Sequence, residues 1–153
     1  TEVSRSEADE YIKGYLRHYS GVDKYMHDVV EKAKKDGYAE TMFARRRYLP
    51  ELTASNANTR AFGERVARNM PIQGTAADII KIAMIRVYER LERENLAAKL
   101  IMQVHDELIV EAPENEKERV SALLKEEMEN AVKLSVALTA DVHSGRTWYD
   151  AKG

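Results

Sequence analysis

The sequence predicts an α+β fold, in which a helical and basic first part precedes a part where helices pack on an antiparallel sheet. Two observations indicate this class. Apolar residues recur at helical spacing in several segments, and the apolar residues of 100–104 and 108–110 flank a short charged tip. The chain has 153 residues, 44% of them hydrophobic and 33% charged. It is therefore long enough for a core and does not have the composition of a disordered protein.

Composition excludes several classes of protein. Without cysteine, the chain has neither a disulfide scaffold nor a thiolate metal site. No apolar run approaches the roughly 20 residues that a membrane-spanning helix needs. The net charge of −2 conceals a basic middle, because residues 41–70 hold six arginines and two glutamates. The first residue is Thr1, which favours a processed chain or a fragment, although removal of Met before Thr is also common.

The first 60 residues are predicted to be mainly helical. Ser4 and Glu7 form the pattern of a capping box, so a helix should run to about Tyr19 and end at Ser20-Gly21. A second helix is expected over residues 22–35, and Gly37 suits its C-terminal cap. A short strand over residues 38–43, a turn at Pro50 and a polar loop over residues 53–58 follow.

A third and a fourth helix are predicted around Pro71. The third covers residues 59–70, where Pro71 stops or bends it. The fourth begins at Thr75 or Asp78 and carries an apolar stripe to about Glu94.

The last part is predicted to contain the sheet. A hairpin should occupy residues 99–112, and a charged helix should follow over residues 114–132. Residues 134–142 suit a last strand, and residues 144–150 are expected to be coil.

The tip of the predicted hairpin holds His105, Asp106 and Glu107 between apolar runs. Burying unpaired charges is costly, so stability does not explain ionisable groups at this place. Carboxylate oxygens are the ligands of Mg²⁺, and a hairpin tip projects them beyond the sheet. The alternative is an ordinary solvated turn. His105 is either a turn residue or a donor to a phosphate or sugar.

Two further sets of polar residues are candidates for contacts with nucleic acid. Arg65, Asn69 and Gln73 are spaced by four, so they share one face if the helix continues past Pro71. Such side chains hydrogen-bond to base edges and backbone oxygens, although most polar rows of this kind are solvated helix faces. Arg45, Arg46 and Arg47 form a possible phosphate-binding cluster, of which at most two could bind one ligand, or else a solvated loop.

Together these motifs closely resemble the C-terminal portion of the family A DNA polymerases, the bacterial DNA polymerase I type. The resemblance covers almost the entire chain. Its motifs, in order, are Gly37-Tyr38-x-x-Thr41, Arg45-Arg46-Arg47-Tyr48-Leu49-Pro50, Glu64-Arg65, Asn69, Pro71-Ile72-Gln73-Gly74-Thr75-Ala76-Ala77-Asp78-Ile79-Ile80, Gln103-Val104-His105-Asp106-Glu107-Leu108 and Gly145-x-x-Trp148.

The resemblance implies a subdomain assignment and roles for the candidate residues. Residues 1–60 match the later part of the fingers, and residues 61–153 match the C-terminal part of the palm. Asp106 matches the metal-binding catalytic aspartate, and Glu107 is its supporting acidic neighbour. His105 lies near the primer end in this family, and Arg65, Asn69 and Gln73 contact the minor groove and primer–template. The implied partners are primer–template DNA and a deoxynucleotide, the implied cofactor is two Mg²⁺ ions, and the implied place is the bacterial cytoplasm, at the nucleoid, or a phage-infected cell.

No segment resembles the family's other catalytic aspartate or its nucleotide-gripping fingers helix. The thumb and the N-terminal palm are also unmatched. Two-metal transfer holds two ions about 3.5–4 Å apart, and one aspartate with a neighbouring glutamate is a poor scaffold for both. We therefore expect this polypeptide alone not to polymerise DNA, whether it is a fragment or one subunit of a split enzyme. The alternatives are a DNA-binding or assembly module without chemistry, and an inert product that oligomerises through exposed apolar surface.

Overall fold

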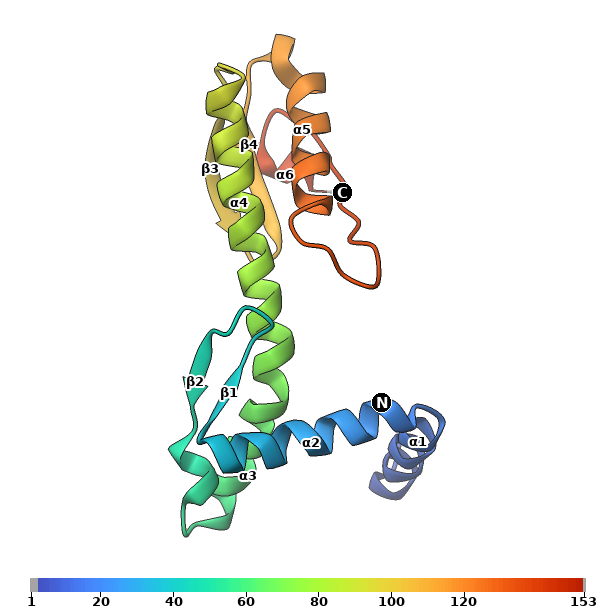
Figure 1. The fold of residues 1–153 in the computed structure, drawn as a ribbon. Helices are drawn as coiled ribbons and strands as arrows, with labels where there is room; N and C mark the ends of the chain where they lie inside the picture. The colour runs from blue at the N-terminus through green and yellow to red at the C-terminus, as the bar shows by residue number, and fades with distance from the viewer. Residues whose placement is uncertain (1–2, 153) are drawn as a thin grey trace. The chain divides into compact units, whose positions relative to one another are not determined.

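The structure is a computed structural model that describes residues 3–152, so Thr1, Glu2 and Gly153 of the predicted segments lie outside the described residues. It divides into two compact units, Thr1–Gly74 and Thr75–Gly153. Its helices and two small antiparallel sheets confirm the predicted α+β class (Figure 1).

Two helices open the first unit, α1 (Arg5–His18) and α2 (Ser20–Asp36). The predicted capping box is present at α1: the Ser4 hydroxyl accepts the backbone N–H of Glu7 at 3.3 Å, and the Glu7 carboxylate accepts the backbone N–H of Ser4 at 2.9 Å. The two predicted helices are separate, but the break lies at Tyr19 and not at Ser20-Gly21, because α2 already begins at Ser20. Gly37 ends α2 with φ of 78°, as its position predicted.

A short ribbon follows α2. Strand β1 (Tyr38–Glu40) pairs with β2 (Arg46–Tyr48), and Tyr38 lies opposite Tyr48. The first strand is shorter than predicted because Thr41 begins the loop, where its hydroxyl accepts the backbone N–H groups of Phe43 and Arg45, each at 3.2 Å. The short helix η1 (Pro50–Thr53) then forms at the predicted turn at Pro50 and includes the first residue of the predicted polar loop.

Helix α3 (Ala57–Asn69) begins earlier than predicted because the Asn56 side chain caps it. It leads directly into η2 (Met70–Gly74), a π-helical turn, so Pro71 does not stop the helix. A proline in a regular α-helix clashes with the carbonyl four residues earlier, and a wider turn accommodates it. The core of this unit is formed by Val30, Ala33, Ala39, Leu49, Leu52 and Ala67.

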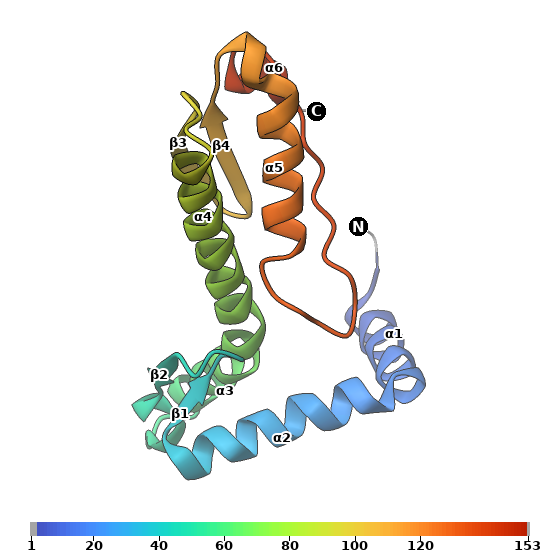
Figure 2. The same cartoon turned by 45° about the horizontal axis from the view of Figure 1, so that its top comes forward.

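The second unit contains α4 (Thr75–Arg93), then β3 (Lys99–Val104) and β4 (Glu107–Glu111), which form the predicted hairpin. The turn η3 (Glu114–Glu116) leads into α5 (Lys117–Glu129), and α6 (Trp148–Ala151) lies in the tail predicted as coil. Helices α4 and α5 and the hairpin pack around one core (Figure 2). Its buried residues are Val87, Leu91, Ala98, Val120, Leu123 and Leu124, with Leu100, Leu108 and Val110 of the hairpin partly buried against them.

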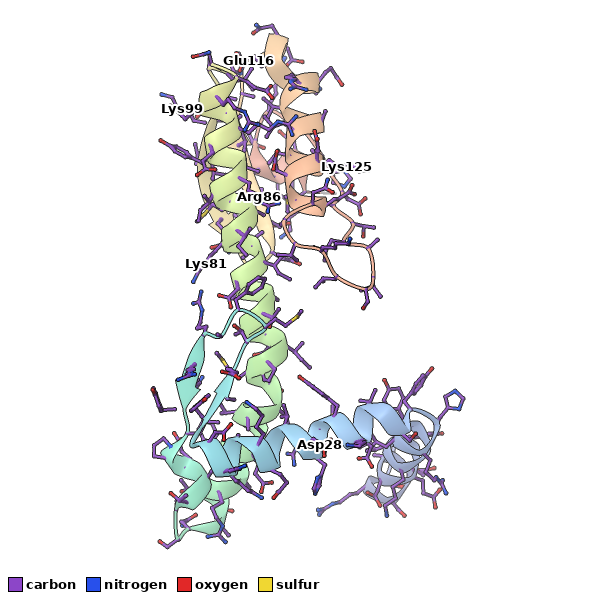
Figure 3. All side chains as sticks on the ribbon, in the orientation of Figure 1. Asp28, Lys81, Arg86, Lys99, Glu116 and Lys125 are labelled. Atoms are coloured by element: carbon purple, nitrogen blue, oxygen red, sulfur yellow. The ribbon has the colours of Figure 1, made fainter. Side chains whose placement is uncertain are left out.

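Charged contacts reinforce the packing of α4 on α5. The Arg90 guanidinium lies 2.9 Å from Glu94 and 2.7 Å from both Glu126 and Glu127. Glu116, labelled in Figure 3 near the end where β3 begins, accepts the backbone N–H groups of Ala97 and Ala98 at 2.9 and 3.0 Å. The two hydrogen bonds from Ala97 and Ala98 to Glu116 provide partners for the backbone N–H groups of the turn between α4 and the hairpin.

The predicted last strand over residues 134–142 is wrong. This segment is coil, although Ala140 is buried and Val142 packs against the core. The N–H of Ala140 donates to the Glu129 carboxylate at 3.1 Å instead of to a neighbouring strand. Leu138, Ala140 and Val142 are therefore partly or fully buried without sheet pairing, whereas Val136 is 70% exposed at a bend. Within residues 3–152, every helix is too short or too polar to cross a lipid bilayer.

Candidate functional site

The candidate site is centred on the tip of the β3–β4 hairpin. Val104 pairs with Glu107, so His105 and Asp106 form a two-residue loop. Leu108 and Val110 face the helices, and Glu107 lies on the opposite face of the ribbon because side chains alternate along a strand. The apolar residues of the two strands thus pack the hairpin against the core of the second unit, and the tip of the hairpin extends beyond that core.

His105, Asp106 and Glu107 are all exposed. The hairpin tip therefore projects these ionisable groups beyond the apolar stretch, as the sequence predicted. Among residues 3–152, no side chain forms an ion pair with Asp106 or Glu107, and both side chains are open to solvent. Two carboxylates without cationic partners, at the tip of a packed hairpin and open to solvent, can accept a cation.

The described residues hold no group of three or more His, Cys, Asp or Glu side chains suited to a metal ion. The tip supplies only the carboxylates of Asp106 and Glu107. This donor set fits Mg²⁺, which takes one or two carboxylates and completes its shell with water and phosphate oxygens. It does not fit a cation that needs a closed protein cage.

The predicted polar row lies on α3 and η2. Arg65 and Asn69 are on α3, Gln73 is in η2, and all three are exposed. Four residues overshoot one turn of an α-helix, so a row spaced by four drifts around the axis. The π-helical turn takes more residues per revolution and reduces this drift, which keeps Gln73 near the line of the other two.

Neighbouring contacts leave Arg65 available for a ligand. Its guanidinium lies over the Phe62 ring, 5.9 Å from the ring centroid, and forms no ion pair within residues 3–152. The adjacent Glu64 is instead held by Lys34 at 3.0 Å and by Arg68 at 3.5 Å. The hydrogen bond from Lys34 is the main reason why the pKa of Glu64 is lowered, so Glu64 stays ionised and paired.

The arginine cluster is divided by the β1–β2 ribbon. Arg46 lies over the Tyr38 ring, 4.5 Å from its centroid, and its Nε atom is 3.6 Å from Glu40. The pKa of Glu40 is lowered, chiefly by a hydrogen bond from Lys32. Arg46 and Arg47 alternate along β2, which agrees with the expectation that three consecutive arginines cannot face one ligand. Arg45 precedes the strand, and its backbone is tied to Thr41.

The structure also shows two residues that the candidate set left out. Phe62 supports the Arg65 guanidinium, and its position three residues earlier on α3 was the available signal. Gln103 donates its side-chain amide to the backbone carbonyl of His105 at 2.6 Å. A polar residue in an apolar strand, two positions before a turn without glycine, was the signal for that contact.

The comparisons with known proteins identify the class to which this fold and hairpin belong. The family model described as DNA polymerase family A matches residues 1–150, and the chain belongs to that family.

Individual relatives agree with this assignment. The chain is 55% identical over 150 residues to DNA polymerase I of Bacillus caldotenax and 54% identical to that of Geobacillus stearothermophilus. Each match covers 98% of this chain and 17% of the relative. A solved structure, the polymerase domain of Pol1 from M. smegmatis in complex with DNA primer-template and dNTP, matches with a TM-score of 0.95 and 45% identity. That match covers 99% of this chain and 27% of the solved one, so the chain spans a minor part of each relative's length.

Proposed function

We propose that this chain provides part of the active site of a template-directed DNA polymerase. Residues 1–60 belong to the fingers and residues 61–153 to the palm. The observation that carries the proposal is the exposed and unpaired Asp106 at the hairpin tip of a family A chain. The place of action is the bacterial cytoplasm, where the template DNA lies.

In the proposed reaction, the 3′-hydroxyl of a primer attacks the α-phosphorus of a deoxynucleoside triphosphate. A new P–O bond forms, the bond to the β-phosphate oxygen breaks, and pyrophosphate leaves with the electron pair while the hydroxyl proton passes to solvent. Asp106 would hold Mg²⁺, of which the complete site uses two, and Glu107 would be its supporting acidic neighbour. Bound Mg²⁺ would offset the negative charge that develops on the reacting oxygens.

The remaining candidate residues have a positioning role in this proposal. Arg65, Asn69 and Gln73 would donate hydrogen bonds to acceptors in the minor groove, where all base pairs present acceptors at similar places. One set of donors can therefore hold any correctly paired primer end. His105 would contact the primer end beside Asp106, and Arg45 and Arg46 would attract the phosphate backbone.

We further propose that these 153 residues do not polymerise DNA by themselves. The described part of the chain brings two adjacent carboxylates to the hairpin tip and no third ligand. Two ions in one site need carboxylates from more than one direction. Segments that correspond to the thumb, the N-terminal palm and the nucleotide-binding fingers helix would supply the missing groups.

A chimera tests the proposal. In this chimera the chain replaces the matching 150 residues of the Bacillus caldotenax DNA polymerase I. We expect the chimera to extend a primed template, and Asp106→Asn to lower its rate by at least about 10³-fold with little change in thermal stability. The exposed control Lys99→Met should leave the rate unchanged. An active chimera that keeps its rate after Asp106→Asn would contradict the role of Asp106, and robust extension by the chain alone would contradict its incompleteness.

The same chimera distinguishes catalysis from simple DNA binding. If the chain only binds the phosphate backbone, affinity falls by about 0.9 log units per tenfold rise in salt for each neutralised phosphate, and Asp106→Asn has no effect on any rate.

A further inference from the structure

The hairpin tip has a strained backbone residue. His105 has φ of 51° and occupies the first position of the two-residue loop. This left-handed conformation brings the side chain close to the following carbonyl oxygen, so two-residue loops usually use Gly, Asn or Asp at such a position. Strain of this kind persists only where the surrounding structure holds it. A contact that holds His105 should therefore be present nearby.

Gln103 makes that contact. Its side-chain Nε2 atom donates to the His105 carbonyl at 2.6 Å, across the start of the turn. The carbonyl belongs to the peptide group that joins His105 to Asp106, so the hydrogen bond fixes the plane from which Asp106 begins. Gln103 is exposed, and its amide would otherwise be solvated. Burial therefore does not explain the contact.

A β-bulge in β3 sets up this geometry. Leu100 pairs with Val110 and Met102 pairs with Ile109, so Ile101 is one extra residue in the strand. If the pairing of Leu100 with Val110 continued without the extra residue, Met102 would lie opposite Leu108 and the loop would have three residues. The bulge instead places Gln103 opposite Leu108 and gives the two-residue loop. The bulge and the hydrogen bond thus specify the same turn.

We propose that Gln103 is a positioning residue, which holds the His105 turn and thereby directs the Asp106 carboxylate. Its catalytic consequence rests on the proposed polymerase function. Gln103 contacts no reacting group and acts only through its hydrogen bond to the His105 backbone.

The first experiment measures the turn in this chain by NMR spectroscopy. Gln103→Met keeps the side-chain length and removes the donor, and Gln103→Glu replaces the donor by an acceptor. We expect either change to shift the three-bond HN–Hα coupling and backbone chemical shifts of His105, with about a fivefold increase in other turn conformers. Lys99→Met, an exposed change on the same strand, is the control and should leave these signals unchanged.

A second background makes the test specific. Glycine adopts a positive φ without the steric penalty of other residues. In a His105→Gly chain, Gln103→Met should therefore change the turn population of Asp106 much less than it does beside His105. An equal change in both backgrounds would overturn the role of Gln103 in holding a strained turn.

The second experiment uses the chimera. Gln103→Met should lower kcat about tenfold and raise the Mg²⁺ concentration for half-maximal rate, while KM for the nucleotide changes less than twofold. A merely destabilised protein would instead show a lower melting temperature than the Lys99→Met control. Unchanged His105 signals, or an unchanged kcat in an active chimera, would overturn the proposal. An inactive parent chimera would count against the proposed function, and the NMR result would still decide whether Gln103 holds the turn.

Discussion

Leu123→Ala tests whether the core of the second unit supports the hairpin. Leu123 is 0% exposed and lies in the cluster against which Leu100, Leu108 and Val110 of the hairpin pack. The change removes three carbon groups from a fully buried side chain, which costs about 2.4 kcal/mol in transfer free energy at about 0.8 kcal/mol for each group. The cavity that remains raises the expected loss to about 3–5 kcal/mol.

Denaturant unfolding of the chain, with hydrogen exchange of the β3 and β4 amides, measures this loss. Leu123→Met nearly conserves the volume and should cost less than about 1.5 kcal/mol. Lys125→Ala, an exposed change on the same helix, should stay within about 0.5 kcal/mol. A loss below about 1 kcal/mol for Leu123→Ala, or unchanged protection of the hairpin amides, would refute the view that this core supports the hairpin.

Three further predictions follow from other parts of the chain. Gly74→Ala should destabilise the protein by about 1–3 kcal/mol in denaturant unfolding, because an added Cβ would lie 2.6 Å from the Thr41 methyl group; a neutral result would contradict this close approach. The pKa of Glu94 is lowered, first by its hydrogen bond from Arg119, so its contribution to stability is complete above the unfolded pKa and is lost as pH falls toward the folded one. Stability of Glu94→Gln should accordingly fall less steeply in acid, and an identical pH slope would count against this pair. In the chimera, Arg65→Ala should weaken primer extension about equally for all primer-end sequences, whereas loss at one base pair alone would indicate sequence readout.

Local chemistry made much of the fold predictable. The capping box at Ser4 and Glu7 and the left-handed cap at Gly37 each use short-range backbone hydrogen bonds that the sequence specifies directly. The hairpin was predictable because its apolar runs and its polar tip are contiguous. In these places the decisive contacts lie within a few residues along the chain.

The features that the sequence did not predict correctly depend on contacts between residues that are distant along the chain or on the register of the strands. Residues 134–142 alternate as a strand would, but a strand needs a partner, and here the segment covers α5 and the core instead. Pro71 suggested a stop or a bend, and the chain instead continues through a π-helical turn without a stop. The hydrogen bond from Gln103 to His105 depends on the β-bulge at Ile101. The position of the bulge could not be predicted, because an apolar run is compatible with either of two registers that differ by one residue. The roles of Asp106 and the polar row stay predictions.

A ribbon of two strands has two edges, and an unpaired edge can pair with a strand of another molecule. Within residues 3–152, β3 and β4 hydrogen-bond only to each other, and the exposed Ile101 and Met102 lie beside those edges. Unpaired edge groups next to apolar side chains are a template for an added strand. In concentrated solution the edge of β3 is therefore one place at which intermolecular β-pairing could start, and a lysine introduced at Ile101 should hinder it.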